Sequence, residues 1–443
     1  MNIGSRRELF VDRVLVETLD GIDFKLHTPQ PAPPPVNTIR GHYMTVFQDG
    51  PLFRAYYRQY DPSYTGEKKD GCQGEITCYA ESASGIEWSY PDLGLFEVNG
   101  SRHNNTVLRL PPYSHNFSPF KDANPAAPAT ARYKALAGTH AKGGIPGGGL
   151  HAFQSPDAIH WDLMQAGAVL DYGDFAFDSQ NVPFWSEAEG CYVCYFRTWK
   201  CSQGKLRAIH RSTSPDFIRW SEPVALDANM PGEHLYTSQT HPYFRAPHIY
   251  VALPTRYQPA RGSSTDILFM ASRAGSTRFE RLFPEAFIRP GGDPTRWGNR
   301  SNYAACGVLP TGPAEISIYH APGGQRYTLR TDGFISLHGG YAGGTVTTKP
   351  FTFAGAELTL NVATSAGGSV KVELQDAEGR PLPGYSLAEA DEIVGDSIDR
   401  IATWKGSPSV APLAGRPVRL HAVMREADMY SVRFRLQGEL NLC

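Results

Sequence analysis

The chain has 443 residues, a formal net charge of −2 at pH 7, and 41% hydrophobic and 12% aromatic residues. The balanced charge, without a basic stripe, argues against nucleic-acid binding, and no continuous apolar stretch of about 18 residues suggests a membrane span. The length favours two domains. The first residues lack the apolar run of a signal peptide, so a cytoplasmic protein is expected, or a periplasmic or secreted one if a leader precedes residue 1.

Glycine (44 residues) and proline (35 residues) are enriched, and long helical periodicity is nearly absent. Together these features predict an all-β fold. The seven cysteines are an odd and sparse set, which suits free thiols. Cys191 and Cys194 have the spacing of half a zinc knuckle, but in a strand they would face opposite sides. The chain also lacks an HxH or HExxH motif, so we assign no metal ligands and no cofactor, and a metal-dependent hydrolase stays open as an alternative.

A repeated unit begins in the first quarter of the chain. "YAESASGIEWSYP" at 79–91 recurs as "AFQSPDAIHWDLM" at 152–164 and "IHRSTSPDFIRWSEP" at 209–223. Each copy has a serine six residues before a tryptophan, and the intervals between these serines are 73 and 59 residues. Tyrosine-rich alternating segments precede the copies and recur beyond them, at 51–60, 131–140, 191–200, 248–257 and 314–322. Units of three to four antiparallel strands, repeated about five times, predict a β-propeller.

The repeat ends near residue 324, and the remaining segments form alternating hairpins without the Ser…Trp unit. We therefore predict a five-bladed β-propeller over residues 1–325, followed by a β-sandwich over residues 326–443. A strand around Asp12 is expected to close the ring by joining the last blade.

Polar residues cluster where the innermost strand of each predicted blade begins. In "FDSQNVPFW" at 177–185, four consecutive polar residues lead into an apolar strand, which the alternation of a half-buried strand does not explain. In a propeller this end of the strand opens into the funnel where ligands bind. The corresponding residues are Arg40 and His42 in blade I; His103, Asn104 and Asn105 in blade II; Asp178, Gln180 and Asn181 in blade III; Glu233, His234 and Tyr236 in blade IV; and Trp297 and Arg300 in blade V. We predict that they converge on one pocket at the propeller axis.

Several stretches resemble a known group of proteins. They include "RRELFVDRVLVE", "NFSPFKDANPAAPATARYKAL", "EHLYTSQTHPY" and "TDGFISLHGGYAGGTVTTKP". In these stretches the chain resembles the glycosyl hydrolase family 32-like proteins of planctomycetes and related bacteria. The resemblance implies a five-bladed propeller with a C-terminal β-sandwich, as in glycoside hydrolase families 32, 68 and 43, and it implies glycosidase activity. The chain lacks the "NDPNG" signature of invertases, and blade I carries Arg40 and His42 where those families have a carboxylate.

Glycoside hydrolysis requires one carboxylic acid and one carboxylate, and the leading hypothesis assigns these roles to Asp178 and Glu233. The other funnel residues would bind a poly- or oligosaccharide. One alternative is a polysaccharide lyase, with His42, His103, His234 or Tyr236 as base and Arg40 and Arg300 neutralising a uronate. Another is a carbohydrate-binding propeller without catalysis. The sequence does not indicate the sugar, the linkage or the oligomeric state.

Overall fold

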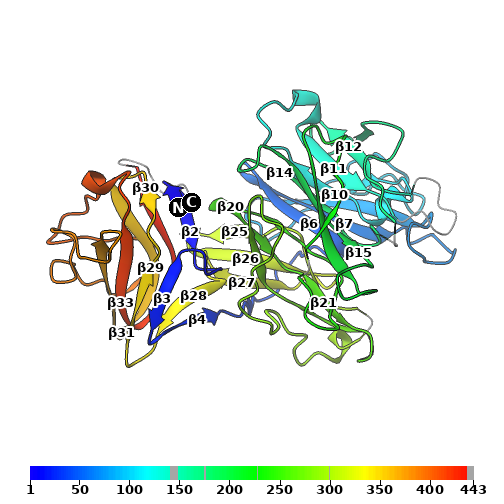
Figure 1. Cartoon of the computed structure of the whole chain (residues 1–443). Coiled ribbons are helices and arrows are strands. Elements are labelled where there is room, and N and C mark those ends of the chain that lie inside the picture. Colours follow the sequence, from blue (N-terminus) through cyan, green and yellow to red (C-terminus); the bar gives the residue numbers. More distant parts are fainter. Residues whose placement is uncertain (140–147, 174–175, 227, 299, 437–443) are drawn as a thin grey trace. The chain divides into compact units, whose positions relative to one another are not determined.

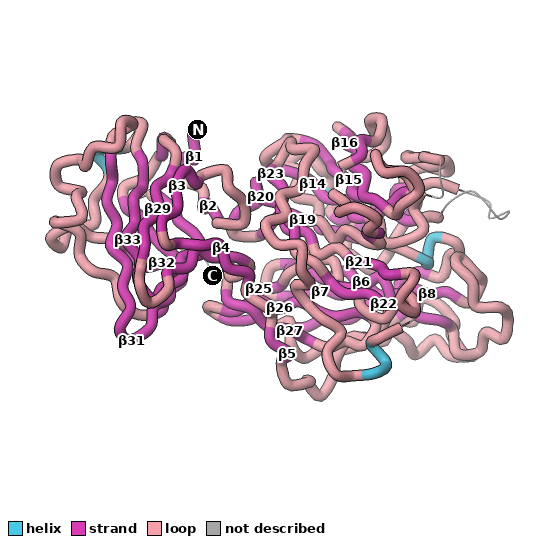
Figure 2. The backbone as a smooth tube through the Cα atoms, turned by 60° about the horizontal axis from the view of Figure 1, so that its bottom comes forward, coloured by secondary structure: helices cyan, strands magenta, loops and turns pink. Residues whose placement is uncertain are grey.

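The computed structural model describes residues 1–139, 148–173, 176–226, 228–298 and 300–436. Strands and loops make up nearly all of it (Figure 2). The helices in this part of the chain are four 3₁₀ segments: η1 (Tyr113–His115), η2 (Ala129–Ala131), η3 (Pro294–Arg296) and η4 (Ala411–Leu413). No described helix is long and apolar enough to span a bilayer. The all-β prediction is confirmed.

The chain divides into two compact units. The propeller unit comprises Pro29–Tyr243 and Pro247–Thr328, and the sandwich unit comprises Met1–Thr28, Phe244–Ala246 and Leu329–Cys443. The second boundary lies three residues beyond the predicted one at residue 325.

Two long strands organise the sandwich unit. These strands, β31 (Glu357–Gln375) and β33 (Arg419–Arg435), pair with each other over nearly their whole length (Figure 1). The other strands are β1 (Asn2–Gly4), β2 (Arg7–Leu9), β3 (Val16–Asp20), β4 (Ile22–Leu26), β28 (Ile335–Gly339), β29 (Gly344–Thr348), β30 (Thr352–Phe353) and β32 (Asp396–Ile401). Leu358, Leu360 and Val362 alternate along β31 and are buried in one core, as the two-residue period of a strand requires.

The N-terminal residues pair with C-terminal strands, which corrects two predictions. Strands β2, β3 and β4 pair with β33, β29 and β28, respectively. The allocation of residues 1–28 to the propeller, with a closing strand around Asp12, is therefore wrong. Phe10 and Leu15 instead bury their side chains in the sandwich core. The strand that completes the last blade is β5 (Gln30–Pro31), paired with β27 (Arg326–Arg330).

The propeller unit contains five groups of antiparallel strands. Blade I consists of β6 (His42–Asp49), β7 (Leu52–Tyr60), β8 (Glu75–Ser82) and β9 (Thr106–Leu108); blade II of β10 (Ser118–Lys121), β11 (Tyr133–Ala137), β12 (His151–Ser155) and β13 (Asp162–Leu163); and blade III of β14 (Val182–Ser186), β15 (Cys191–Thr198), β16 (Ala208–Ser214) and β17 (Val224–Ala225). Each is a four-stranded sheet in chain order.

The last two blades have interrupted strands. Blade IV contains β18 (His234–Leu235) and β19 (His241–Tyr243), then β20 (Ala246–Ala252) and β21 (Thr255–Gln258), then β22 (Ser264–Ile267) and β23 (Met270–Arg273). Blade V contains β24 (Tyr303–Ala304), β25 (Leu309–Gly312), β26 (Glu315–Ala321) and β27, with β5 outermost. The described strands of blade IV form two separate three-stranded sheets, β18-β21-β22 and β19-β20-β23, and a closed ring of five blades stays a prediction.

The Ser…Trp repeat forms one recurring turn. Ser82, Ser155 and Ser214 are the last residues of the third strand in blades I to III. The hydroxyls of the first two accept hydrogen bonds from the backbone N–H groups of Gly85 and Ala158. Gly85, Ala158 and Phe217 share a left-handed φ of 69–71°. The repeat is therefore a structural device that turns the chain towards the outer strand.

A chain of amide hydrogen bonds joins four blades near the axis. The Gln180 side chain donates from Nε2 to Met44 O (3.1 Å) and to Thr45 Oγ1 (2.7 Å). Gln239 Nε2 donates to Gln180 Oε1 (2.8 Å) and to Ala304 O (2.8 Å). Both glutamine side chains are buried. The central strands are thus linked by buried side-chain amides that hydrogen-bond to other protein groups in place of water.

We expect Gln180→Ala to lower the free energy of unfolding by about 2–4 kcal/mol, because it leaves several buried polar groups without partners. Gln48→Ala, at an exposed glutamine on β6, is the matched control and should change it by less than about 0.5 kcal/mol. Chemical denaturation followed by fluorescence measures both. Equal effects of the two substitutions would contradict the role of the axial network.

Candidate active site

Blade II begins later than the sequence analysis predicted. The segment with His103, Asn104 and Asn105 leads into β9, which pairs with β8 as the outer strand of blade I. The innermost strand of blade II is β10, and the residues before it include His115 and Asn116. A long connection after the first Ser…Trp copy, already visible as the 73-residue interval, displaces the blade boundary.

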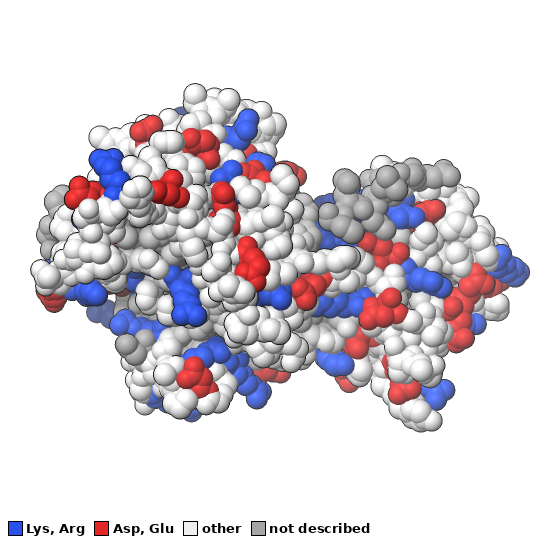
Figure 3. All heavy atoms as spheres, turned by 180° about the vertical axis from the view of Figure 1, so that it is seen from behind, with Lys and Arg blue, Asp and Glu red and all other residues white. Residues whose placement is uncertain are grey.

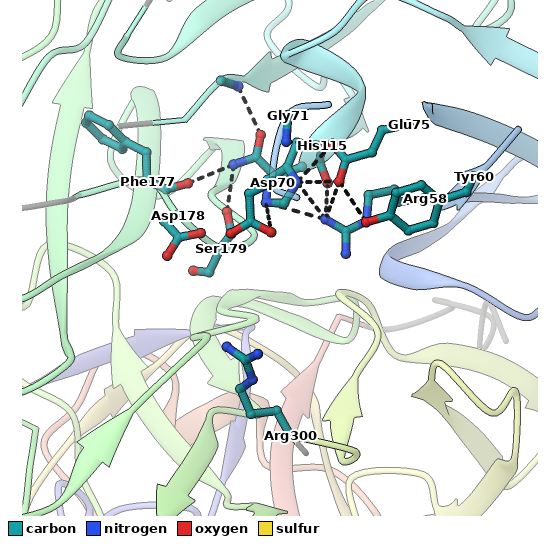
Figure 4. A network of polar contacts seen from close by, with 12 residues as sticks. Arg58, Tyr60, Asp70, Gly71, Glu75, His115, Phe177, Asp178, Ser179 and Arg300 are labelled. Atoms are coloured by element: carbon teal, nitrogen blue, oxygen red, sulfur yellow. Dashed lines mark hydrogen bonds and ion pairs between the residues drawn. The ribbon is translucent and has the colours of Figure 1, made fainter. Parts of the chain in front are cut away.

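Three side chains from different blades meet at the funnel end of the inner strands (Figure 4). Asp178 precedes β14, His115 precedes β10, and Asp70 comes from the loop between β7 and β8. One nitrogen or oxygen atom of each lies within 4.8 Å of the others. The His115 side chain is fully buried, whereas that of Asp70 is 60% exposed. The cluster therefore combines a buried histidine with an exposed carboxyl group that a ligand can reach.

Buried charges hold His115 in place. Its Nδ1 lies 2.9 Å from Glu75 Oε1 and 2.6 Å from Arg58 Nη1, and Arg58 is in turn 3.1 Å from Glu75 Oε1. Its Nε2 lies 3.9 Å from Asp70 Oδ1. The ring packs edge-on against Tyr43, with centroids 5.3 Å apart. These contacts on β7 and β8 orient His115 so that Nε2 faces the carboxylates.

The two carboxyl groups have opposite electrostatic tendencies. Partial burial raises the pKa of Asp70, and the neighbouring Asp178 raises it further, against the opposing effects of His115 and Arg58. Burial alone would raise the pKa of Asp178 too, but the Arg197 guanidinium, 2.9 Å from Oδ2, and a hydrogen bond from Asp70 lower it. Asp70 therefore tends to keep a proton while Asp178 is ionised.

The same three residues offer donor atoms for a metal ion. Two carboxylate oxygens and an imidazole nitrogen are ligands that divalent cations accept. Glu75 beside the other ring nitrogen of His115 resembles the carboxylate that often orients a metal-bound histidine. The geometry thus fits a cation as well as a shared proton, and a metal test is part of any functional assignment.

Aromatic and arginine side chains form the other side of the site. Tyr236 OH accepts a hydrogen bond from Arg300 Nη1 (3.5 Å), and the Tyr236 and Tyr303 rings lie 5.6 Å apart. Burial raises the pKa of Tyr43. The nearby Tyr236 and Asp178 raise it further, and Arg58 opposes them. Tyr43 therefore links the carboxylates to the Tyr236 side of the site.

Several predicted residues do lie in or beside this site. His42 is close to Arg58 and His115, and burial with the Arg58 charge lowers its pKa to about 4. His234 accepts a hydrogen bond at Nδ1 from the backbone of Arg207 (3.2 Å). Gln180 belongs to the axial network, and Asn181 donates to Phe177 O and Ser179 O beneath Asp178. These two amides position the strand and are too buried to bind a substrate.

Other predicted residues have different surroundings. His103 is exposed and pairs with Asp92, Asn104 bonds the loop carbonyls of Phe96 and Ser101, and Asn105 bonds Tyr57 OH and Tyr79 O. These contacts belong to blade I. Arg40 and Trp297 are exposed; Trp297 Nε1 donates to Gly291 O in its own loop. The structure does not connect these residues to the cluster around Asp178.

Glu233 makes a buried ion pair away from Asp178 in the contact network. Both carboxylate oxygens accept from Arg281 (2.6 and 2.9 Å), and one also accepts from Met230 N (3.1 Å). Glu233 and Arg281 are each 6% exposed. A carboxylate with both oxygens held in this way is suited to stabilising blade IV. The structure therefore does not favour Glu233 as the catalytic partner of Asp178.

Sequence analysis missed Asp70, Glu75, His115 and Arg58. Asp70 lies in "GEKKDG", which has the composition of a solvated hairpin loop. His115 follows two prolines in "PPYSHNF", and only a correct blade boundary would have placed it at an inner strand. The unequal repeat interval was the available signal.

No protein family model and no curated protein sequence matches this chain. Solved structures do match. A "Glycoside hydrolase" shares 14% identity at a TM-score of 0.45, over 68% of this chain and 91% of that one. A glycoside hydrolase family 43 arabinoxylan arabinofuranohydrolase from Bacillus subtilis shares 14% identity at a TM-score of 0.39, over 91% of this chain and 97% of that one. A beta-1,2-mannobiose phosphorylase from Listeria innocua shares 11% identity at a TM-score of 0.45, over 70% of this chain and 97% of that one. Similarity at this level carries no argument about function, which rests on the site itself.

We expect Glu233→Gln to lower the free energy of unfolding by about 3 kcal/mol, because it leaves Arg281 buried with a weakened partner. Glu285→Gln, at an exposed position of the same blade, is the matched control and should be nearly neutral. Urea denaturation of both variants tests this role. An unchanged stability of Glu233→Gln would contradict it.

Proposed function

We propose that the protein is a glycoside hydrolase in which Asp70 is the general acid and Asp178 the nucleophile. One observation carries the proposal: two carboxyl groups adjoin at the funnel, and their surroundings drive their pKa values apart. A pair of this kind is what glycosidic bond cleavage needs, since one group must give a proton while the other stays ionised.

The contacts of Asp178 suit a nucleophile. Arg197 donates to its Oδ2 and holds the carboxylate in its ionised form, and the Asp178 side chain remains 20% exposed. Attack of this carboxylate on the anomeric carbon would form a glycosyl ester as the bond to the leaving oxygen breaks. Asp70 would protonate that oxygen and then, as a carboxylate, take a proton from the water that hydrolyses the ester.

The spacing of the pair favours retention of anomeric configuration. Retaining enzymes hold their carboxyl groups about 5–5.5 Å apart, and inverting ones about 6.5–9.5 Å apart to admit a water molecule. Oxygens of Asp70 and Asp178 lie within 4.8 Å of each other. This separation lies below both ranges and leaves no room for a water molecule between the two groups, so direct attack is favoured over attack by an intervening water.

A metal-dependent hydrolase is the second candidate, because Asp70, His115 and Asp178 also have the geometry of a cation site. A bound divalent ion would supply an activated water or polarise a sugar oxygen. The lyase hypothesis remains a third outcome, with Tyr236 as base beside Arg300. Chelation tests the former, and an unsaturated, ultraviolet-absorbing product identifies the latter.

We expect Asp178→Asn and Asp70→Asn each to reduce kcat by about 10²–10⁴-fold or more, with unchanged thermal melting. Asp92→Asn, at an exposed aspartate of blade I, is the matched control and should retain activity. Steady-state kinetics on a panel of aryl glycosides and oligosaccharides measures the effects. Asp178→Gly with azide should give a glycosyl azide if Asp178 is the nucleophile. Activity that survives in Asp178→Asn would exclude the assignment, and activity lost on chelation and restored by a divalent cation would favour the metal candidate.

We expect kcat/KM to follow a bell-shaped pH profile with an acidic optimum. The rate should fall as pH drops through the lowered pKa of Asp178, because the nucleophile is then protonated. It should also fall as pH rises through the raised pKa of Asp70, because the acid has then lost its proton. The two limbs report the coupled pair. A rate that keeps rising through neutral pH would contradict Asp70 as the acid.

A further inference from the structure

The arginines around the site differ in how their charge is balanced. Arg58 pairs with Glu75 at 3.1 Å and Arg197 with Asp178 at 2.9 Å. Arg207 has no acidic partner within the described part of the chain, and its Nε is buried without a hydrogen-bond acceptor. A half-buried guanidinium without an ion-pair partner is costly. An anionic ligand that accepts hydrogen bonds from Arg207 would offset this cost.

Arg207 is held over an aromatic platform. Its guanidinium carbon lies 3.9 Å from the centroid of the Trp199 ring, 4.6 Å from that of Tyr257 and 4.9 Å from that of Tyr236. Cation–π contacts of this kind hold the planar group in position without neutralising it. Burial and the neighbouring Arg197 lower the pKa of Arg207, against the opposing effects of Tyr236, Tyr257 and Asp178. The three aromatic rings therefore hold the Arg207 guanidinium in a fixed position, without an ion pair in the described residues.

Arg300 lies at the same tyrosine from another blade. Its Nη1 is 3.5 Å from Tyr236 OH, its side chain is exposed, and its backbone has a left-handed φ of 57°. Such a backbone at a non-glycine residue is uncommon and persists only where the surrounding structure determines it. Figure 4 shows Arg300 and Asp178 in the same close view, ahead of β24 and β14, respectively. Arg207 and Arg300 thus both contact Tyr236, and Arg207 also interacts electrostatically with Asp178.

The surplus of positive charge is local. On the face shown in Figure 3, acidic and basic side chains are interspersed, and the whole chain carries a formal charge of −2. The half-buried Arg207 would not serve a neutral sugar, because its desolvation cost would have no matching anion, and the exposed Arg300 adds a second positive charge at Tyr236. Planar donors of this type match carboxylate and sulfate oxygens in a two-pronged hydrogen bond.

We propose that Arg207 and Arg300 form a subsite for an anionic sugar, one that carries a carboxylate or a sulfate ester next to the bond that reacts. This inference rests on the proposed function in that the ligand is a carbohydrate, and it names the substrate class. The aromatic rings of Trp199 and Tyr257 hold Arg207, and the charge of Arg207 acts on Asp178. The anionic ring therefore lies within electrostatic reach of the nucleophile.

Binding of monosaccharides tests the subsite without requiring turnover. Titration calorimetry compares galacturonate and glucuronate with galactose and glucose, and galactose 6-sulfate with galactose, on the full chain. We expect at least one anionic sugar to bind about tenfold or more tightly than its neutral counterpart, and the preference to weaken as salt increases. The uronate and sulfate arms identify which anion is bound.

Variants locate the effect. Arg207→Met keeps the length of the side chain and should weaken binding of the anionic sugar by about 10–100-fold without changing that of the neutral one. Arg300→Met should act in the same direction, Arg207→Lys should rescue part of the affinity, and Arg289→Met, at an exposed arginine of blade IV, is the matched control. Thermal melts establish that each variant is folded.

Equal or undetectable binding of anionic and neutral sugars, or an Arg207→Met variant that keeps the preference, would overturn the subsite. The outcome is independent of the proposed hydrolysis. Hydrolysis of neutral glycosides alone would refute the subsite and leave the hydrolase intact. Selective binding of uronates with an unsaturated product, or with no turnover, would support the subsite and refute the hydrolase.

Discussion

The propeller unit depends on satisfying polar groups where its inner strands converge. Five strands that meet at an axis bring backbone carbonyls close together and exclude most of the water that would solvate them. Gln180 and Gln239 meet this constraint, because their amides bond each other, Met44 O and Ala304 O. Asn116 does the same between blades II and III, donating to Phe177 O and Ser179 O. The amides in the polar cluster ahead of β14 are thus explained mainly by the fold, and Asp178 is the member left for chemistry.

The same convergence forces bends, and the candidate site is built on them. Tyr43, Phe177, Gln239 and Arg300 stand at or before the inner strands of blades I, III, IV and V, and all have a left-handed backbone although none is glycine. Each bend costs of order 1–3 kcal/mol and persists because the packing around it determines the conformation. The bends at Phe177 and Arg300 set Asp178 and Arg300 at opposite sides of the site. Strain that the axial network stabilises therefore positions the functional side chains.

Local patterns predicted the fold well, and spatial pairs escaped prediction. The Ser…Trp unit repeats because its turn bonds lie within a few residues, from Ser155 Oγ to Ala158 N for example, so a single sequence contains the whole signal. The same is true of Asp178, which adjoins a recognisable strand. Asp70 and His115 are 45 residues apart in the chain and meet only through blade order. One misplaced boundary, after the long connection in blade I, was enough to substitute His103 for His115. Glu233 was misjudged for a related reason, since its partner Arg281 lies 48 residues later, in the loop after β23.

A protonated acid in an arginine-rich site requires that nearby positive charge be absorbed by other groups. Arg58 would stabilise the ionised form of Asp70, but Glu75 lies closer to it and takes up its charge. Arg197 is engaged by Asp178 in the same way. Burial and the neighbouring Asp178 then outweigh the charge of His115, so the pKa of Asp70 stays raised. Glu75 therefore acts on the reaction through Arg58 and His115, without touching a substrate. Arg207 lies outside this matched set, so an anionic sugar would neutralise it without drawing charge away from the Asp70–Asp178 pair.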